Sequence, residues 1–311
     1  MMGTGPFAGP TLRALVASQH QVLGVVSRPA RVRAKEPLPP MHQVTIELGL
    51  DLWTPQSINL AESIDRLAAL NADLLVVCDY GEILRPGALA ATRLGGINLH
   101  GSLLPKYRGA APVQWAVMNG DEVTGVSVIH MTPGLDAGPI LAQKSLAVDP
   151  DETAGELEAR LAPLGAEVVL QVVEQLETDS ASPIPQANEA VTKAPRLTKR
   201  QGWLDWSLPA RQLKFRVRGL HPWPRAFTYW QVGDRPAMRV NIDRVALDER
   251  PIGGASPGEL LEGDGRFVVA TGQGAMEIVL IQPAGKRVMT GEEFLRGYGR
   301  GRLVPGDEAI G

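Results

Sequence analysis

The most informative stretch of this chain is Ile97-Asn98-Leu99-His100-Gly101-Ser102-Leu103-Leu104-Pro105-Lys106-Tyr107-Arg108-Gly109-Ala110-Ala111-Pro112. A short apolar lead precedes Asn98 and His100, which are two positions apart, so on a strand both side chains leave the same face. A loop with glycine, proline and cations follows at once. In open parallel sheets, ligands bind at the carboxyl ends of the strands. The stretch therefore predicts a strand that ends in a functional site.

A carboxylate that suits this site comes later in the chain. Asp136 lies within Thr132-Pro133-Gly134-Leu135-Asp136-Ala137-Gly138-Pro139. An amide can stabilise a developing oxyanion, an imidazole can stabilise charge or move a proton, and a carboxylate can orient the imidazole. These three groups suit acyl transfer to an amine. The simpler alternatives are that Asn98 caps a strand end and that Asp136 is a turn residue; the other four histidines are interpreted as structural.

The first half of the chain alternates strands and helices. Short turns marked by glycine and proline separate them, which indicates an α/β fold with a doubly wound, mainly parallel sheet. Pro163 and Gly165 are expected to divide or kink the last helix. The predicted strands are 22–26, 48–53, 74–78, 96–100 and 125–130, and the predicted helices are 11–18, 58–70, 111–119 and 153–177.

The second half of the chain has a different sequence pattern. A polar, proline-bearing segment begins near Thr178 and is expected to be an extended, solvated linker. Short strands around tight glycine turns follow it, and a run of such hairpins predicts a small β-barrel. The predicted strands here are 228–232, 238–242, 267–270 and 276–281. The expected division is therefore a catalytic domain at 1–180, a linker at 181–200 and a barrel domain at 201–311.

Composition narrows the class of protein. Hydrophobic residues make up 44% and charged residues 21% of the 311 residues, which is typical of a globular protein long enough for two domains. No apolar run approaches the roughly 20 residues that span a bilayer. The sequence begins without the pattern of a secretory leader, so we expect a cytoplasmic protein that does not bind membranes. Cys78, the only cysteine, is expected to be a small buried hydrophobe and excludes a disulfide framework.

Charge is unevenly distributed. Residues 198–311 carry 17 Lys and Arg against 13 Asp and Glu, whereas the rest of the chain has a net charge of −7. A basic second half next to an acidic first half is compatible with a polyanionic partner, and equally with a solvated surface.

The stretch from Ile97 to Pro112 resembles the 10-formyltetrahydrofolate-dependent formyltransferases, and within them the enzymes that formylate methionyl-tRNA. The resemblance covers nearly the whole chain, since it continues through Asp205-Trp206-Ser207, His221-Pro222-Trp223-Pro224, Val269-Ala270-Thr271-Gly272 and Gln282-Pro283-Ala284-Gly285-Lys286. It implies a Rossmann-like formyltransferase domain and a C-terminal OB-like β-barrel that helps to hold tRNA. It also implies transfer of a formyl group from 10-formyltetrahydrofolate to initiator methionyl-tRNA, with no metal, by a monomer.

The resemblance further implies roles for individual residues. Asn98 is expected to bind the oxyanion, His100 to stabilise charge or relay a proton, and Asp136 to set the charge and orientation of the imidazole. The folate is expected to contact Ser102, Leu103, Leu104 and Pro105, and Tyr80 in a neighbouring loop. The expected tRNA contacts are Arg31, Arg33, Lys35, Lys106, Arg108, Lys199, Arg200, Lys286 and Arg287, with Arg211, Lys214, Arg216 and Arg218 as further candidates.

Two features depart from the family pattern. The family begins with a hydrophobic strand before a segment like Met2-Gly3-Thr4-Gly5-Pro6-Phe7-Ala8, but here only Met1 precedes it. We therefore expect the first strand to be missing, the natural protein to start upstream with about five mostly apolar residues, and neighbouring strands to be left unpaired without them. The basic loop after the second strand, here 28–35, is shortened and lacks glycine but keeps its charge.

Several alternatives share parts of this pattern. Glycinamide ribonucleotide formyltransferases have the same three chemical groups but lack a second domain. Sugar-nucleotide formyltransferases and formyltetrahydrofolate hydrolases are disfavoured by the signatures at 205–207 and 221–224. From a different class of function, the chain could be a noncatalytic RNA-binding protein on a formyltransferase scaffold, which the intact Asn98, His100 and Asp136 argue against.

Overall fold

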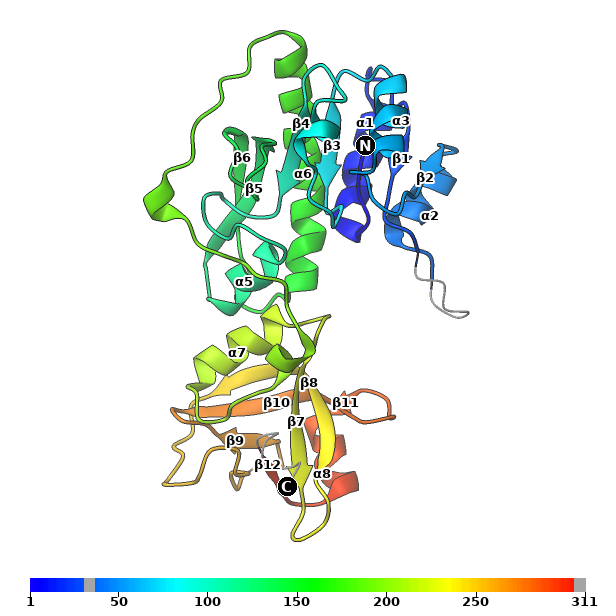
Figure 1. The fold of residues 1–311 in the computed structure, drawn as a ribbon. Coiled ribbons are helices and arrows are strands. Elements are labelled where there is room, and N and C mark those ends of the chain that lie inside the picture. Colours follow the sequence, from blue (N-terminus) through cyan, green and yellow to red (C-terminus); the bar gives the residue numbers. More distant parts are fainter. Residues whose placement is uncertain (31–36, 264, 305–311) are drawn as a thin grey trace. The chain divides into compact units, whose positions relative to one another are not determined.

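The computed structural model describes residues 1–30, 37–263 and 265–304, which form two compact units (Figure 1). The first unit contains Met1–Pro112, Val123–Ala147 and Leu157–Pro195, and the second contains Val113–Glu122, Val148–Glu156 and Arg196–Gly311. Two short segments from the first half of the chain thus belong to the second unit. No local sequence pattern indicates this exchange, because it depends on contacts between residues far apart in the chain.

The first unit is an α/β structure. Its sheet is made of strands β1 to β6, and its described helices lie before, between and after them. The strands are β1 (Val25–Val26), β2 (Leu52–Trp53), β3 (Leu75–Cys78), β4 (Gly96–His100), β5 (Val123–His130) and β6 (Ile140–Ala147); the helices are η1 (Pro6–Ala8), α1 (Gly9–Ala17), α2 (Pro40–Glu47), α3 (Ala61–Ala69), α4 (Pro86–Leu89), α6 (Ala154–Glu177) and η2 (Asn188–Ala190).

The sheet is parallel on one side and antiparallel on the other. β1 pairs with β2 and β3 with β4 in parallel, whereas β5 pairs antiparallel with both β4 and β6. The predicted doubly wound sheet is confirmed, but β6 was not predicted. Its second half is mostly exposed and carries the consecutive polar residues Gln143, Lys144 and Ser145, so its apolar signal is weak.

Met2 lies between β1 and β3, directly after the strand that we expected to be missing. It pairs in parallel with both Val26 and Val77, which joins the two parts of the sheet. Its N–H donates to the Val76 carbonyl (2.8 Å), and its carbonyl accepts from the Cys78 N–H (2.9 Å). Met2 is also 1% exposed within a core cluster. On the other side, the Val26 N–H donates to the Met1 carbonyl (2.9 Å) and the Gly3 N–H donates to the Val26 carbonyl (3.0 Å). The expectation that these ladder groups would be unpaired is therefore wrong, because residues 1–3 bond to the strands on both sides.

Strand β4 separates a packing face from a functional face. A Cβ atom placed on Gly165 of α6 would lie 2.7 Å from Leu99 Cδ2, so Leu99 packs closely against this helix. Because side chains alternate along a strand, Asn98 and His100 project from the opposite face. The long helix α6 runs without interruption through Pro163, contrary to the predicted division, and its buried apolar face holds it against the sheet (Figure 1).

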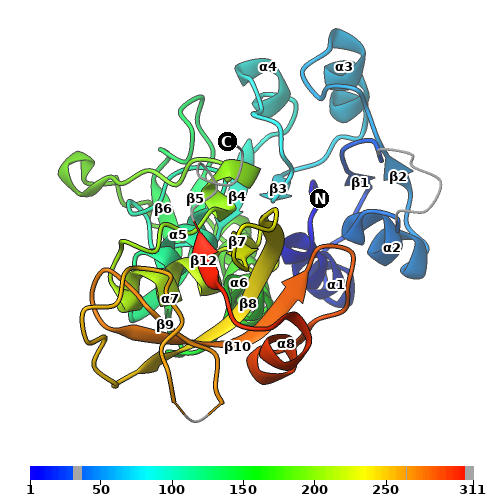
Figure 2. The same ribbon diagram turned by 90° about the horizontal axis from the view of Figure 1, so that it is seen from below.

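The second unit is a curled antiparallel sheet with two longer helices. Its strands are β7 (Ala226–Gln231), β8 (Met238–Asp248), β9 (Val268–Ala270), β10 (Ala275–Pro283), β11 (Met289–Thr290) and β12 (Arg302–Val304); its helices are α7 (Ala210–Gly219), α8 (Gly291–Tyr298) and η3 (Lys199–Gly202), and most of α5 (Pro112–Met118) also belongs to it. Figure 2 shows the curl of the strands.

Residues 258–261 join the two ends of this curled sheet. The strand order is β11-β10-β8-β7-β12, with β9 paired to β10. Glu259 bridges to Arg302 of β12, while Leu260 bridges to Val269 of β9. The predicted OB-like barrel is thereby confirmed, and the short bridging segment was not foreseen because it lacks an alternating apolar pattern.

Two smaller expectations concern burial. Cys78 is fully buried, and burial raises the pKa of its thiol well above the usual value, which agrees with a structural role. Among the described residues, no helix has the length and apolar character needed to cross a membrane.

Candidate active site

The side chains of Asn98, His100 and Asp136 meet on the functional face of β4. The Asn98 amide nitrogen Nδ2 donates to Asp136 Oδ1 at 3.4 Å, and His100 Nδ1 lies 3.7 Å from Asp136 Oδ2. His100 is 5% exposed, whereas Asn98 and Asp136 are half-buried. The structure therefore brings together the amide, imidazole and carboxylate that the sequence predicted as a catalytic set.

Acceptors face both nitrogens of the His100 ring. Nε2 lies 2.9 Å from the Tyr107 carbonyl oxygen, which can only accept, and Nδ1 faces the Asp136 carboxylate. A neutral ring donates from one nitrogen only, whereas the imidazolium donates from both. The Tyr107 carbonyl and the Asp136 carboxylate therefore fix the orientation of the ring between them.

Backbone geometry holds the Asp136 carboxylate in place. Its Oδ2 accepts from the Gly109 N–H at 2.8 Å. Asp136 itself has φ 48°, in the left-handed region that aspartate tolerates better than most residues. Gly109 has φ 129°, and a Cβ there would lie 2.4 Å from the Ala194 carbonyl oxygen, so only glycine fits.

The segment from Ile184 to Ala194 supports both loops of the site. We predicted this segment to be solvated, and its side chains are mostly exposed. Its backbone is nonetheless bonded: the Arg108 N–H donates to the Thr192 carbonyl (2.9 Å), and the Ala194 N–H donates to the Arg108 carbonyl (2.8 Å). The side chain of Gln186 also reaches the loop that carries Asp136. Sequence reasoning missed these residues because a polar, proline-bearing segment has no periodic signal.

The backbone of the segment expected to contact folate, Ser102–Pro105, is held by side chains of β5 and β6. Ser102 and Leu104 are buried, whereas Leu103 and Pro105 are partly exposed. Ser127 Oγ donates to the Ser102 carbonyl and accepts from the Leu104 N–H, and Gln143 Nε2 donates to the Leu104 carbonyl. Leu103 and Pro105 are thus the side chains of this segment that can reach a ligand, while Ser102 and Leu104 anchor it.

Tyr80 lies in the loop after β3, and its side chain points into the core. It is 2% exposed within the cluster that contains Met2 and Val77, and its carbonyl accepts from Thr4 Oγ1. Burial, with the charge of Glu82, raises the pKa of its hydroxyl to about 12. A contact between this residue and folate would therefore have to come from its backbone.

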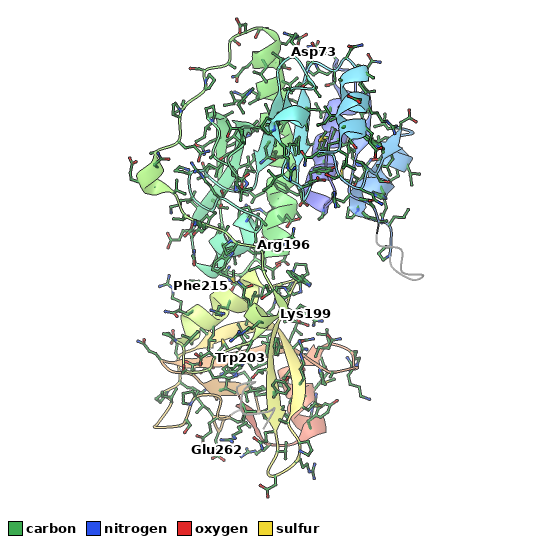
Figure 3. All side chains as sticks on the ribbon, viewed as in Figure 1. Asp73, Arg196, Lys199, Trp203, Phe215 and Glu262 are labelled. Atoms are coloured by element: carbon green, nitrogen blue, oxygen red, sulfur yellow. The ribbon has the colours of Figure 1, made fainter. Side chains whose placement is uncertain are left out.

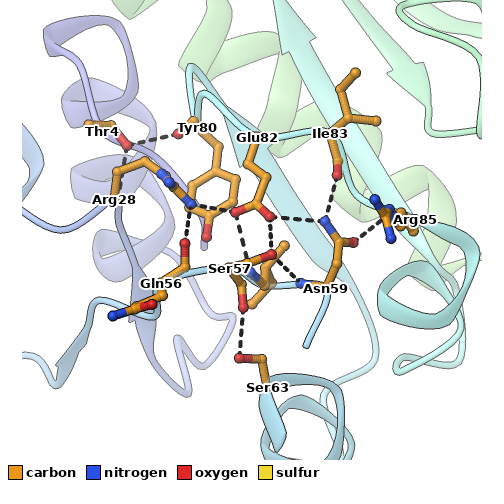
Figure 4. A network of polar contacts seen from close by, with 11 residues as sticks. Thr4, Arg28, Gln56, Ser57, Asn59, Ser63, Tyr80, Glu82, Ile83 and Arg85 are labelled. Carbon is orange, nitrogen blue, oxygen red and sulfur yellow. Dashed lines mark hydrogen bonds and ion pairs between the residues drawn. The ribbon is translucent and has the colours of Figure 1, made fainter. Parts of the chain in front are cut away.

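Glu82 ties this loop to two others (Figure 4). Its carboxylate accepts from Arg28 Nη1 (2.5 Å), the Ile58 N–H (3.2 Å), Asn59 Nδ2 (3.0 Å) and Ser57 Oγ. The three loops follow β1, β2 and β3, so one carboxylate joins successive loops at the carboxyl edge of the sheet. Sequence reasoning did not single out Glu82.

Comparison with known proteins decides the family. A family model described as formyl transferase matches residues 1–173, and one described as formyl transferase, C-terminal domain, matches residues 196–299. The chain belongs to the formyl transferase family. The predicted resemblance is thereby confirmed.

Relatives of this formyl transferase match it along its whole length. It is 44% identical over 324 residues to the methionyl-tRNA formyltransferase of Rhodopirellula baltica, which covers 100% of this chain and 96% of the relative. It is 43% identical over 309 residues to that of Methylobacterium nodulans, with 98% and 96% covered. Among solved structures, the N-formyltransferase of Helicobacter canadensis, in complex with folinic acid and dTDP-3-aminofucose, matches with a TM-score of 0.64. The match covers 91% of this chain and 97% of that one at 14% identity, so it shows the fold alone.

The cations expected to contact tRNA differ in their exposure to solvent, and three of them lie outside the described residues. Arg31, Arg33 and Lys35 lie outside the described residues. Exposed positions are held by Lys106 of the formyl transferase's first unit, and by Lys199 (labelled in Figure 3), Arg200, Lys286 and Arg287 of its second. Arg287 is paired with Glu293 at 3.2 Å.

Three further cations form hydrogen bonds or an ion pair with residues of their own unit. Arg108 is half-buried against Gln186, whereas Arg218 is 7% exposed and donates to the Asp149 and Glu152 carbonyls. Lys214 pairs with Asp151. Arg218 is thus structural. In the part of the chain that the structure describes, no cluster of three or more His, Cys, Asp or Glu residues could hold a metal ion.

The Glu82 network leads to a prediction for this formyl transferase. Glu82→Ala is expected to lower the free energy of unfolding by about 2–3 kcal/mol, because Arg28 and the other donors lose a charged acceptor that is mostly buried. The loop after β3 should also loosen and raise KM for folate. Denaturant unfolding measures the first effect. Glu62→Ala, at an exposed position on α3, is the control; equal stability of the two variants would contradict the role of the network.

Proposed function

We propose that this chain transfers the formyl group of 10-formyltetrahydrofolate to the α-amine of methionine esterified to initiator tRNA, giving N-formylmethionyl-tRNA and tetrahydrofolate. The observation that carries the proposal is the contact of Asn98 and His100 with Asp136 on one face of β4. Full-length relatives 37–44% identical and named methionyl-tRNA formyltransferase support the choice of substrate.

The reaction exchanges one carbon–nitrogen bond for another. The methionyl nitrogen forms a bond to the formyl carbon and loses one proton, while the bond from that carbon to the folate nitrogen breaks and the folate nitrogen gains one proton. Negative charge develops on the formyl oxygen between these events. Asn98 Nδ2, at the edge of the site, can donate to that oxygen, and such a donor typically contributes about 3–4 kcal/mol to the transition state.

His100 and Asp136 act on the charge of the oxyanion and on the proton that the amine loses. The imidazolium form of His100 stabilises the developing oxyanion, and Asp136 faces Nδ1 to hold the ring in place. The attacking amine has a pKa of about 8 when free, so a useful fraction is neutral near pH 7 and no nucleophile from the protein is needed. The enzyme mainly has to position the amine. Since His100 acts as the imidazolium, the Asp136 carboxylate accepts the amine proton through a water molecule.

The loop segments supply the binding surfaces. Leu103 and Pro105 offer partly exposed apolar side chains to the folate, on a backbone that Ser127 and Gln143 hold rigid. The basic residues of the second unit would bind tRNA phosphates. Since charged tRNA and reduced folate are both substrates, we place the enzyme in the cytoplasm, and one chain carries every group named here, so a monomer suffices.

A formylation assay tests the proposal. Purified protein, 10-formyltetrahydrofolate and charged tRNA are mixed, with initiator and elongator methionyl-tRNA run side by side. We expect rapid formylation of the initiator species and little of the elongator species. Formylation of glycinamide ribonucleotide or an amino-sugar nucleotide instead would favour the enzymatic alternatives, and tRNA binding without turnover would favour a noncatalytic RNA-binding protein.

The role of the second unit gives a further prediction. Lys199→Ala combined with Lys286→Ala should weaken tRNA binding and reduce the slope of log K against log salt by about 1–2, since each phosphate contact accounts for roughly 0.7–0.9. Binding measured across a range of salt concentrations tests this. Arg93→Ala, which removes an exposed cation paired with Asp73 in the first unit, should leave the slope unchanged. A slope unaltered by the double substitution would rule out phosphate contacts by these two lysines.

A further inference from the structure

We propose that Gln186 is a positioning residue that couples the catalytic carboxylate of Asp136 to the guanidinium of Arg108. The inference rests on the proposed function and deepens it, because it assigns to Arg108 a backbone phosphate or ester oxygen at the acceptor end of tRNA. The three residues are far apart in the sequence and meet only in the folded chain. Arg108 lies in the loop after β4, Asp136 in the loop after β5 and Gln186 in the segment after α6.

The Gln186 amide is fully used in bridging the two loops. Its Nε2 donates to the Asp136 carbonyl (2.9 Å) and to the Gly138 carbonyl (2.7 Å). Its Oε1 accepts from Arg108 Nε (3.0 Å) and Nη2 (2.7 Å). One planar group thus holds the backbone of the carboxylate loop with its donor end and the arginine with its acceptor end.

The carboxylate loop needs this support. Pro133, Gly134, Leu135 and Ala137 are exposed, so packing does little to restrain the loop around Asp136. Asp136 is also in the left-handed region, with φ 48°. Two hydrogen bonds from Gln186 to carbonyls on either side of Ala137 fix the backbone from which the carboxylate reaches His100 and Asn98. Misplacement of a catalytic group by about 1 Å can cost up to a hundredfold in rate.

The arginine is oriented without being neutralised. Gln186 is uncharged, so the guanidinium keeps its full positive charge, and its contacts occupy the Nε–Nη2 edge. The Nη1 side of the guanidinium then points away from Gln186 with its donors in a fixed plane. A planar array of donors with an undiminished charge suits a phosphate or an ester oxygen.

Kinetics of variants in the full-length enzyme test the coupling. Gln186→Ala should lower kcat about tenfold, as expected for the loss of one or two net hydrogen bonds that act on the transition state. It should also raise KM for initiator methionyl-tRNA severalfold and leave KM for 10-formyltetrahydrofolate unchanged. Arg108→Ala should raise KM for the tRNA with little effect on kcat. Asn188→Ala, an exposed amide in the same segment, is the matched control and should behave as the wild type.

The double variant separates coupling from general damage. If Gln186 acts on tRNA through Arg108, Gln186→Ala should add nothing to KM for tRNA in the Arg108→Ala background, yet should still lower kcat. Additive effects on KM would overturn the coupling. Should Gln186→Ala fail to fold, the nearly isosteric Gln186→Glu loses both donors to the carbonyls and should show the fall in kcat. Wild-type kcat in either Gln186 variant would overturn the inference while leaving formylation by the native enzyme, and hence the proposed function, intact.

Discussion

Asn98→Ala and His100→Ala are each expected to lower kcat about 100-fold or more, because each removes a group that acts on the charge developing at the formyl oxygen. KM for folate should change far less, since the segment around Leu103 is held by Ser127 and Gln143 rather than by the catalytic side chains. Initial rates at saturating concentrations of both substrates measure the effect.

A control variant tests whether replacing any histidine by alanine lowers turnover. His20→Ala, in the segment after α1 at a half-exposed position, should retain normal turnover. Thermal unfolding should confirm that both catalytic variants remain folded. Near-normal kcat in His100→Ala at saturating substrates would remove His100 from the mechanism and leave Asn98 as the main stabilising group.

Gly109→Ala is the second substitution with a large expected effect. The new Cβ would lie 2.4 Å from the Ala194 carbonyl oxygen, and the residue has φ 129°, where an L side chain is strained. The loop must shift, which displaces the N–H that donates to Asp136. We expect a loss of about 1–3 kcal/mol or more in the free energy of unfolding, and a fall in kcat of at least about tenfold.

Gly297→Ala is the matched control for this substitution. It lies in α8, where a Cβ meets nothing within 4 Å, so alanine should leave stability unchanged or raise it by about 0.5–1 kcal/mol. Denaturant unfolding and initial rates compare the two variants. Stability and turnover in Gly109→Ala equal to those of the wild type would show that the loop accommodates a side chain, and that its close approach to Ala194 does not position Asp136.

The amino-acid sequence determined the local features of this protein. Short apolar runs between turns marked by glycine and proline predicted β4 and most of the other strands, and the spacing of two residues put Asn98 and His100 on one face. The boundaries differed by a few residues, as for helix 58–70, which forms only from Ala61 to Ala69. The hairpin turns of the second half likewise predicted a barrel. These features depend on periods of two or 3.6 residues, which can be read within a short window.

The tertiary structure decided everything that depends on contacts across long stretches of chain. Asp136 is 38 residues from Asn98, and Gln186 is 50 residues from Asp136, yet the three meet. Tyr80 illustrates the same limit, because its place in a functional loop did not reveal that its ring is buried in the core. The direction of a loop side chain and the partner of a polar group depend on which distant segments pack together, and no local periodicity encodes that choice.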